Sequence, residues 1–282
     1  LSINNVFLDL YRANQIADTA TVTLRGGVYF RTRGFNDTVA NLVIESPGGT
    51  KDGYGSTVVT GAGTLRLTGN ITAQNLDDVR VPAWLGGNLW LPAATTVSVD
   101  TVKDTLVSGP SGISGFNGQI GLTIGANLVS ATTINKTGSG VLQLAGVSYV
   151  QNTVNVNAGA LVLGNSTNYG LTQVNVGAGG ILDMRGQNNL QLGSVIGAGT
   201  IKNFHAAQTA ATLITGADNT DGTFSGTFVS DFSIALLNVR KMGTGNWTLS
   251  GDSSGSMLGT LTVANGIGVP GAVGTRGSGW SK

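Results

Sequence analysis

The chain of 282 residues has no cysteine, five prolines, a single histidine and few charges. Without cysteine there can be no disulfide bond and no thiol nucleophile. Because His205 is the sole histidine, a histidine-based metal site or a Ser-His-Asp triad lacks its usual partners. Charged residues make up 10% of the chain, against about 25% in ordinary soluble domains. These absences disfavour most kinds of polar catalytic site.

The charges that are present nearly cancel, since 15 basic and 14 acidic residues leave a net charge of +1. No basic stripe runs along the sequence, so we expect no nucleic-acid partner. An apolar run of about 18 residues, which a membrane-spanning helix needs, is also missing. We therefore expect no direct membrane span in this chain.

Glycine is abundant, with 45 residues, and hydrophobic residues make up 40% of the chain. Much of the glycine belongs to one recurring phrase, in which a glycine precedes two positions, usually apolar, that are separated by one spacer. Such alternation is typical of a strand with one buried and one wet face. The phrase occurs at residues 63–67, 140–144, 159–163, 180–184, 199–203, 245–249 and 259–263.

The middle copies of the phrase are regularly spaced, as the glycines at 140, 159, 180 and 199 show. A second series, Val154, Val174 and Val195, runs in step with them. Recurrence at this period predicts an all-β fold, a parallel β-helix (β-solenoid) with about 20 residues per rung. Two inward columns are expected: Leu142, Leu161, Leu182 and Ile201 in one, and the three valines in the other.

We expect residues 1–282 to form a single continuous β-helix segment of a longer repeat protein, because neither end contains an evident cap. Two stretches, near 76–92 and 205–232, break the rhythm and are expected to leave the rungs as excursions. In the first, Trp84 and Trp90 flank a Gly-Gly pair that suits a hairpin tip. Whether these tryptophans pack onto the helix or contact a partner stays open, whereas Trp247 is expected in the core.

Several segments match one pattern, Lys-Thr-Gly-x-Gly-x-Leu-x-Leu-x-Gly followed by a Val-Asn-x-Gly-x-Leu-x-Leu-Gly strand. Residues 136–146 and 153–164 fit it well, 241–251 form a second copy, and 59–69 a third with Val in place of Lys. The chain thus resembles the autotransporter-associated β-strand repeat family. The resemblance implies a right-handed parallel β-helix from the passenger of a secreted bacterial surface protein. The repeat itself implies no catalytic residue.

The acidic residues offer little for chemistry. Asp77 and Asp78 are the only adjacent pair, and neighbours on a strand point to opposite faces. Asp218 and Asp221 lie in an Asp-Asn-Thr-Asp-Gly stretch that could bind calcium, but it lacks the full alternating acidic pattern. An Asx turn is the simpler interpretation, and the calcium alternative stays open. We predict no catalytic, cofactor-binding or metal residue, and no cofactor.

The expected function is a non-enzymatic extracellular scaffold at the bacterial cell surface: a stiff structural or adhesive fibre, coat or passenger segment, able to self-assemble. Its expected partners are further copies or repeats of the same protein, and surface glycans. One alternative is a β-helix that binds or cleaves carbohydrate, with the two excursions as the walls of a cleft. Another is a component of a phage fibre or coat.

Overall fold

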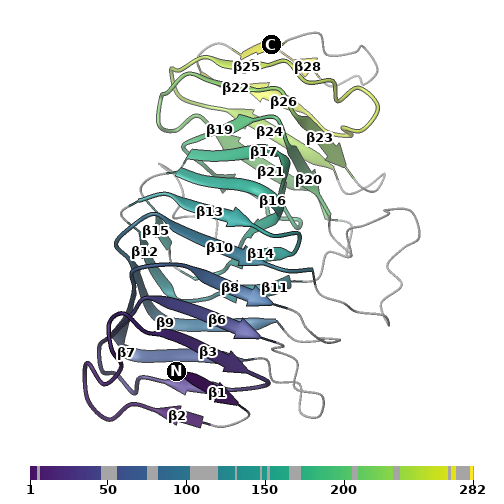
Figure 1. Cartoon of the computed structure of the whole chain (residues 1–282). Coiled ribbons are helices and arrows are strands. Elements are labelled where there is room, and N and C mark those ends of the chain that lie inside the picture. The colour runs from purple at the N-terminus through teal and green to yellow at the C-terminus, as the bar shows by residue number, and fades with distance from the viewer. Residues whose placement is uncertain are drawn as a thin grey trace. The chain divides into compact units, whose positions relative to one another are not determined.

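The computed structural model describes residues 1–4, 7–45, 56–74, 82–101, 120–130, 132–146, 148–150, 153–164, 173–204, 209–230, 236–265, 268–270 and 280–281. These residues form parallel strands and no helix, and therefore contain no helix long and apolar enough to cross a membrane (Figure 1). The chain divides into two compact units, residues 1–149 and 150–282. Each unit is a stack of β-solenoid coils, which confirms the predicted fold class, while its handedness stays a prediction.

The strands of unit 1 stack into three parallel ladders, here named A, B and C. Ladder A contains β1 (Ser2–Asn4), β3 (Thr21–Arg25), β6 (Asn41–Glu45), β8 (Ile71–Gln74), β10 (Thr95–Val99) and β13 (Ile134–Thr137). Ladder B contains β2 (Phe7–Asp9), β4 (Tyr29–Arg31), the first halves of β7 (Thr57–Leu67) and β9 (Ala83–Leu91), β11 (Ile120–Ile124) and β14 (Val141–Leu144). Ladder C contains β5 (Asp37–Val39), the second halves of β7 and β9, and β12 (Asn127–Ser130).

Unit 2 also has three ladders, D, E and F; the short β15 (Ser148–Val150) precedes them in the sequence. Ladder D contains the first halves of β16 (Thr153–Leu163) and β17 (Gln173–Asp183), then β19 (Ser194–Gly197), β22 (Gly222–Phe224), β25 (Trp247–Leu249) and β27 (Gly268–Pro270). Ladder E contains the second halves of β16 and β17, β20 (Thr200–Asn203) and β23 (Thr227–Ser230). Ladder F contains β18 (Leu190–Gln191), β21 (Ala211–Thr215), β24 (Leu237–Lys241), β26 (Leu261–Val263) and β28 (Trp280–Ser281).

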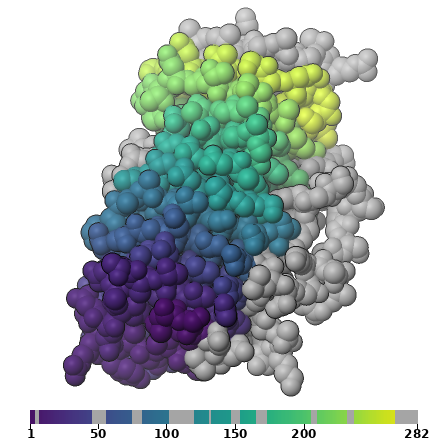
Figure 2. Space-filling view, in the orientation of Figure 1, coloured from purple at the N-terminus to yellow at the C-terminus, as the bar shows by residue number. Residues whose placement is uncertain are grey.

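The core of unit 1 consists of inward columns that run from turn to turn. In ladder A, Val22, Leu42, Ile71 and Val97 are register partners, and each is 0% exposed. Side chains alternate across each strand, so the residues between them face outward. On the surface of unit 1, successive turns form bands that pass from purple to blue (Figure 2). Each turn therefore buries its apolar face only against its neighbours, as in other solenoids.

The inward columns predicted for unit 2 are confirmed. Leu161, Leu182 and Ile201 are register partners in ladder E, and all three are fully buried. Val154, Val174 and Val195 are likewise partners in ladder D, with exposures of at most 1%. Leu142, the first residue of the predicted leucine column, is buried in unit 1. Trp247 lies in the core as predicted, 3% exposed, with its indole Nε1 donating to the Val195 carbonyl at 2.8 Å.

The turns average roughly 24 residues, which is longer than the predicted period. The predicted period holds in the regular middle of the chain, where Val154 pairs with Val174. The turn is longer where Leu42 pairs with Ile71, and longer still where Val97 pairs with Lys136. The repeated phrase marks strands and corners, but it does not predict the length of every turn.

The expectation that the stretches near 76–92 and 205–232 leave the rungs is wrong for most of their described residues, which lie in strands of the ladders. Residues 83–91 form β9, so the Gly-Gly pair is a corner within one strand and not a hairpin tip. Within 205–232, residues 211–215, 222–224 and 227–230 form β21, β22 and β23. Within the two predicted excursions, residues 76–81, 205–208 and 231–232 lie outside the described residues. Trp84, Trp90, Phe224 and Phe228 lie in strands, and composition alone did not distinguish these strands from loops.

Asparagine side chains join successive turns at the corners. The Oδ1 atoms of Asn36, Asn41 and Asn70 accept hydrogen bonds from backbone N–H groups one turn later, at 2.8–2.9 Å. In unit 2, Asn219 and Asn238 do the same for Thr244 and Thr260. Corners leave backbone donors that the ladders do not pair, and asparagine satisfies them without burying a charge.

Candidate binding surface

The two tryptophans of β9 point outward on either side of a corner. Trp84 and Trp90 are 42% and 41% exposed, while the alternate residues Leu85 and Leu89 are buried. Between them, Gly87 has a φ of +91°, a conformation that side chains rarely adopt. Trp84 therefore faces outward from ladder B and Trp90 from ladder C. The question left open by the sequence is answered in part: neither tryptophan is in the core.

The Trp84 indole covers two glycines of the sheet surface. A Cβ atom built on Gly125 would lie 2.2 Å from the Trp84 Cζ2 atom, and one built on Gly86 would lie 2.7 Å from its Nε1 atom. Gly125 directly follows β11, whose residue Thr123 is the register partner of Trp84. Since neither glycine has a side chain, the indole lies against the backbone of the sheet and its other side remains exposed to solvent.

Other aromatic residues continue the same outward column. Along ladder B, the successive register partners are Phe7, Tyr29, Thr57 and Trp84. The Phe7 and Tyr29 rings are stacked, with centroids 5.4 Å apart, and Phe7 is 66% exposed. This column is missing from the sequence-based prediction. Its signal is the matching triplets Phe7-Leu8-Asp9 and Tyr29-Phe30-Arg31, in each of which an aromatic, an apolar and a charged residue follow one another.

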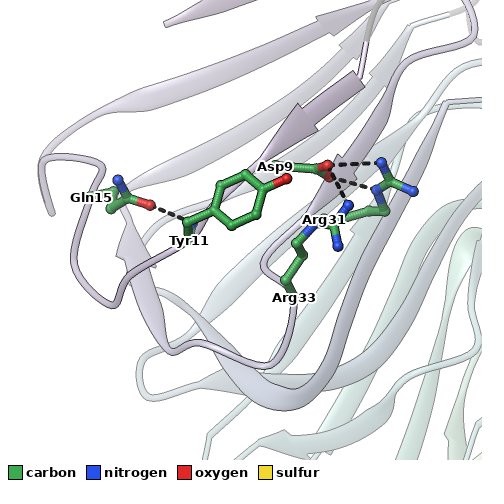
Figure 3. A network of polar contacts seen from close by, with 5 residues as sticks. All are labelled: Asp9, Tyr11, Gln15, Arg31 and Arg33. Carbon is green, nitrogen blue, oxygen red and sulfur yellow. Dashed lines mark hydrogen bonds and ion pairs between the residues drawn. The ribbon is translucent and has the colours of Figure 1, made fainter.

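A charged network flanks the aromatic column (Figure 3). Arg31 donates from Nε and Nη2 to the two oxygens of the Asp9 carboxylate, at 2.5 and 2.8 Å, and Arg33 donates from Nη2 at 2.8 Å. These bonds, that from Arg31 above all, hold the pKa of Asp9 below its ordinary value. The Arg33 guanidinium also lies over the ring of Tyr11. The backbone N–H of Tyr11 donates a hydrogen bond to the Gln15 Oε1 atom at 2.7 Å.

A second cation–aromatic pair lies around the corner, on ladder C. Arg66 and Trp90 are register partners, and the Arg66 guanidinium carbon is 5.0 Å from the ring centroid. Val129, the next residue in this column, is 46% exposed. We call the outward residues of ladders B and C and their shared corner the aromatic face, which comprises Phe7, Asp9, Tyr11, Tyr29, Arg31, Arg33, Arg66, Trp84 and Trp90.

The remaining candidates from the sequence are placed apart from this face or are not described. His205, Asp77 and Asp78 lie outside the described residues. Asp218 Oδ1 accepts from the Thr220 N–H at 3.2 Å, which is the Asx turn that the sequence predicts, and Asp221 Oδ1 accepts from the Asn246 N–H at 2.7 Å. Within the described ranges, no three His, Cys, Asp or Glu side chains gather as a metal site requires.

The lysine of the repeated phrase is a buried corner residue. Lys136 is fully buried, and its ammonium donates to the Thr137 and Gly138 carbonyls at 2.7 and 2.8 Å. Lys241 is buried in the same way, donating to the Met242 and Gly243 carbonyls. Burial lowers the pKa of Lys136 to about 8, although the charge of Asp100 opposes the shift.

Burial also lowers the pKa of Lys241, while the charges of Asp218 and Asp221 oppose this shift. The Lys241 ammonium is thus the cation that these two carboxylates stabilise. A buried positive charge beside them disfavours a second cation. The calcium alternative therefore gains no support from the geometry.

A buried aspartate in unit 2 is also structural. The Asp183 carboxylate accepts hydrogen bonds from the Arg185 backbone N–H at 3.1 Å, the Arg185 Nε at 2.9 Å and the Phe204 N–H at 3.3 Å. Burial raises the pKa of Asp183, and Arg185 opposes the rise. Because these partners come from the chain itself, the carboxylate acts as a bracket between β17 and the end of β20.

Comparisons with models of known protein families, with curated proteins and with solved structures found no match. The resemblance to the autotransporter-associated repeat therefore stays a prediction that rests on the residues alone. The fold and the aromatic face are therefore the features of the molecule that bear on its function.

Proposed function

We propose that this protein is a non-enzymatic structural and adhesive scaffold of the bacterial cell surface. The observation that carries the proposal is the series of inward apolar columns in each unit, such as Val22, Leu42, Ile71 and Val97 in ladder A. Each turn is hydrogen-bonded to the next and covers its apolar face. Stability of such a stack grows with the number of turns, which suits a stiff spacer or fibre.

The polar side chains support the same interpretation. Corner asparagines bond to the backbone of the following turn, and the two buried lysines bond to corner carbonyls. The carboxylates of Asp9 and Asp183 are held by arginines, and that of Asp37 accepts hydrogen bonds from the backbone N–H groups of residues 15, 16 and 38. Groups held in this way stabilise a structure, whereas a general acid or base has to be within reach of a substrate.

The extracellular location rests on the resemblance of the repeats to bacterial surface proteins. Low charge, no cysteine and short corners are compatible with a protein that must resist proteases outside the cell. Self-association, or continuation into further repeats, would extend the same parallel ladders. Adhesion is the part of the proposal that the aromatic face supports, because large exposed aromatic residues mark contact surfaces.

Limited proteolysis, thermal unfolding and negative-stain electron microscopy of the whole chain at several concentrations test the scaffold. We expect resistance to proteases and either filaments or short rods. Filaments would support self-assembly, and rods at every concentration would restrict the role to a spacer. Rapid digestion within the ladders, or an irregular expanded particle, would contradict the proposal.

A further inference from the structure

We propose that the aromatic face of unit 1 binds an extended glycan whose sugars carry carboxylates. The inference rests on the adhesive part of the proposed function and adds a site and a ligand class to it. Three features of the face support it: the presentation of the rings, their spacing along ladder B, and the arginines beside them.

The Trp84 ring is presented as a flat platform. It lies against the backbone at Gly86 and Gly125, and 42% of the residue remains exposed. The face of an indole is electron-rich, and the C–H groups on one side of a sugar ring form an apolar, weakly positive surface that matches it. An indole that served packing alone would be covered by large side chains of the neighbouring turns, but its register partners there are Thr57 and Thr123, and Gly86 and Gly125 beneath it have no side chain.

The spacing suits a long ligand more than a compact one. Parallel strands are about 4.8 Å apart, so Tyr29 and Trp84, separated by the turn of Thr57, lie about 10 Å apart along the stack. Phe7 continues the column by one more turn and stacks on Tyr29. A chain of linked sugars running along ladder B would meet aromatic rings at two places, with the Thr57 position between them.

The charges favour carboxylates on that chain. Arg31, Arg33 and Asp9 together have a charge of +1, and the two arginine side chains are 36% and 43% exposed. Arg33 uses only Nη2 on the Asp9 carboxylate, and its other N–H groups are suited to a planar anion such as a carboxylate. Arg66, around the corner, adds a further positive charge beside Trp90.

Other ligand classes fit less well. The rings of Tyr29 and Trp84 lie on strands that are paired on both sides, so an extended peptide could not add main-chain hydrogen bonds beside these rings. Nucleic acid would require a larger excess of positive charge than three arginines and one aspartate provide. A second copy of the chain is the remaining occupant, and the experiment below distinguishes it.

The test measures binding of the whole chain to two immobilised probes by biolayer interferometry. One probe is alginate, a linear polymer of uronate sugars, and the other is the same polymer with its carboxylates reduced to alcohols. We expect Trp84→Ala to weaken binding to alginate by about tenfold or more, as for loss of a central aromatic contact. Arg33→Gln, which leaves the Arg31–Asp9 pair in place, should weaken alginate binding and leave binding to the reduced polymer unchanged.

Matched controls come from unit 2. Leu258, 47% exposed, and Arg240, also exposed, lie outside the aromatic face, so Leu258→Ala and Arg240→Gln should bind alginate as the unchanged chain does. Circular dichroism and thermal unfolding check that each variant keeps its fold, which is expected because Trp84 and Arg33 face outward.

Three results would overturn the site. The first is equal binding by the unchanged chain and folded Trp84→Ala, including no binding by either, and the second is equal affinity for the charged and reduced polymers. The third is a dimer in size-exclusion chromatography that Trp84→Ala converts to a monomer without any glycan binding, which would make the face an interface between copies. A protease-resistant rod that does not bind the glycan would contradict the proposed site but not the proposed scaffold function. A protease-sensitive chain that binds the glycan would contradict the scaffold function but not the site.

Discussion

The strand pairs β7–β9 in unit 1 and β16–β17 in unit 2 turn their corners alike but differ outside. In both pairs the register shifts at a glycine-containing corner, and buried aliphatic residues continue on either side. Outside, β16–β17 places Asn155 beside Asn175, with the Nδ2 and Oδ1 atoms 3.1 Å apart. At the equivalent place before the corner, β7–β9 has Val59 beside Gly86, and after the corner it has Arg66 beside Trp90. The inward residues therefore determine the coil, and the outward residues determine what it can contact.

The largest loss of stability is expected in both strand pairs when an inward residue is made polar. Leu161→Asp in β16 and Leu65→Asp in β7 each place a lone carboxylate in a dry column, since both leucines are fully buried. We expect each to lower the free energy of unfolding by about 4 kcal/mol or more, measured by urea unfolding. Val129→Asp, at an outward position, is the control and should change stability by less than about 0.5 kcal/mol. A stable, protease-resistant Leu161→Asp chain would refute the assigned inward face.

Replacing a corner glycine should cause the next largest loss of stability, both in β16–β17 and in β7–β9. A Cβ on Gly180 would lie 1.9 Å from the Val156 carbonyl oxygen, and one on Gly87 would lie 2.1 Å from Thr60 Oγ1 at a φ of +91°. Replacement by alanine should cost about 1–3 kcal/mol at each, seen as a lower unfolding midpoint. Gly255→Ala, with nothing within 4 Å of the added Cβ, should be neutral. Equal stability of all three variants would show that the corners yield freely.

Lys136 should make stability depend on pH. Burial lowers its folded pKa to about 8 from 10.5, so the folded state loses this proton more readily than the unfolded state. The contribution of Lys136 is therefore most favourable above pH 10.5 and is lost as the pH falls towards 8. Relative to Lys136→Met, the unchanged chain should gain stability as the pH rises through this window. Parallel stability curves for the two proteins would contradict a buried, shifted lysine.

The outward asparagine pair should give the smallest effect. Asn155→Ala removes the hydrogen bond from Asn175, and we expect a loss of about 0.5–1.5 kcal/mol in urea unfolding. The double variant with Asn175→Ala should lose less than the sum of the two single losses, because both remove the same bond. Strict additivity would show that the two side chains do not stabilise one another.

Much of the fold was predictable because it follows from local pattern. Alternation at Val154 and Val156 marks an inward and an outward face, and its return at Val174 and Val195 gives the register of three turns. The regular middle of the chain has this property because its turns have nearly constant length. The candidate site was less predictable, because its residues come from turns that do not repeat.

Two particular residues show where sequence reasoning stops. Trp84 and its proline-containing surroundings resemble a loop, yet Trp84 lies in a strand because its neighbours Ala83 and Leu85 enter the core. Lys136 has the charge of a surface residue, yet it is the register partner of Val97 in a buried column. In each case the deciding contact comes from a different turn of the coil.

The sequence by itself determined the parallel coil, its inward columns at Leu161, Leu182 and Ile201, and the glycine corners, since alternation and short spacing are local properties. Only the tertiary structure decided that Phe7, Tyr29 and Trp84 form one outward column and that two lysines lie inside. The physical reason is register. Ladder A joins Val22 to Leu42 across a short turn but Val97 to Lys136 across a much longer one, and such unequal steps are settled only when whole turns stack and pair.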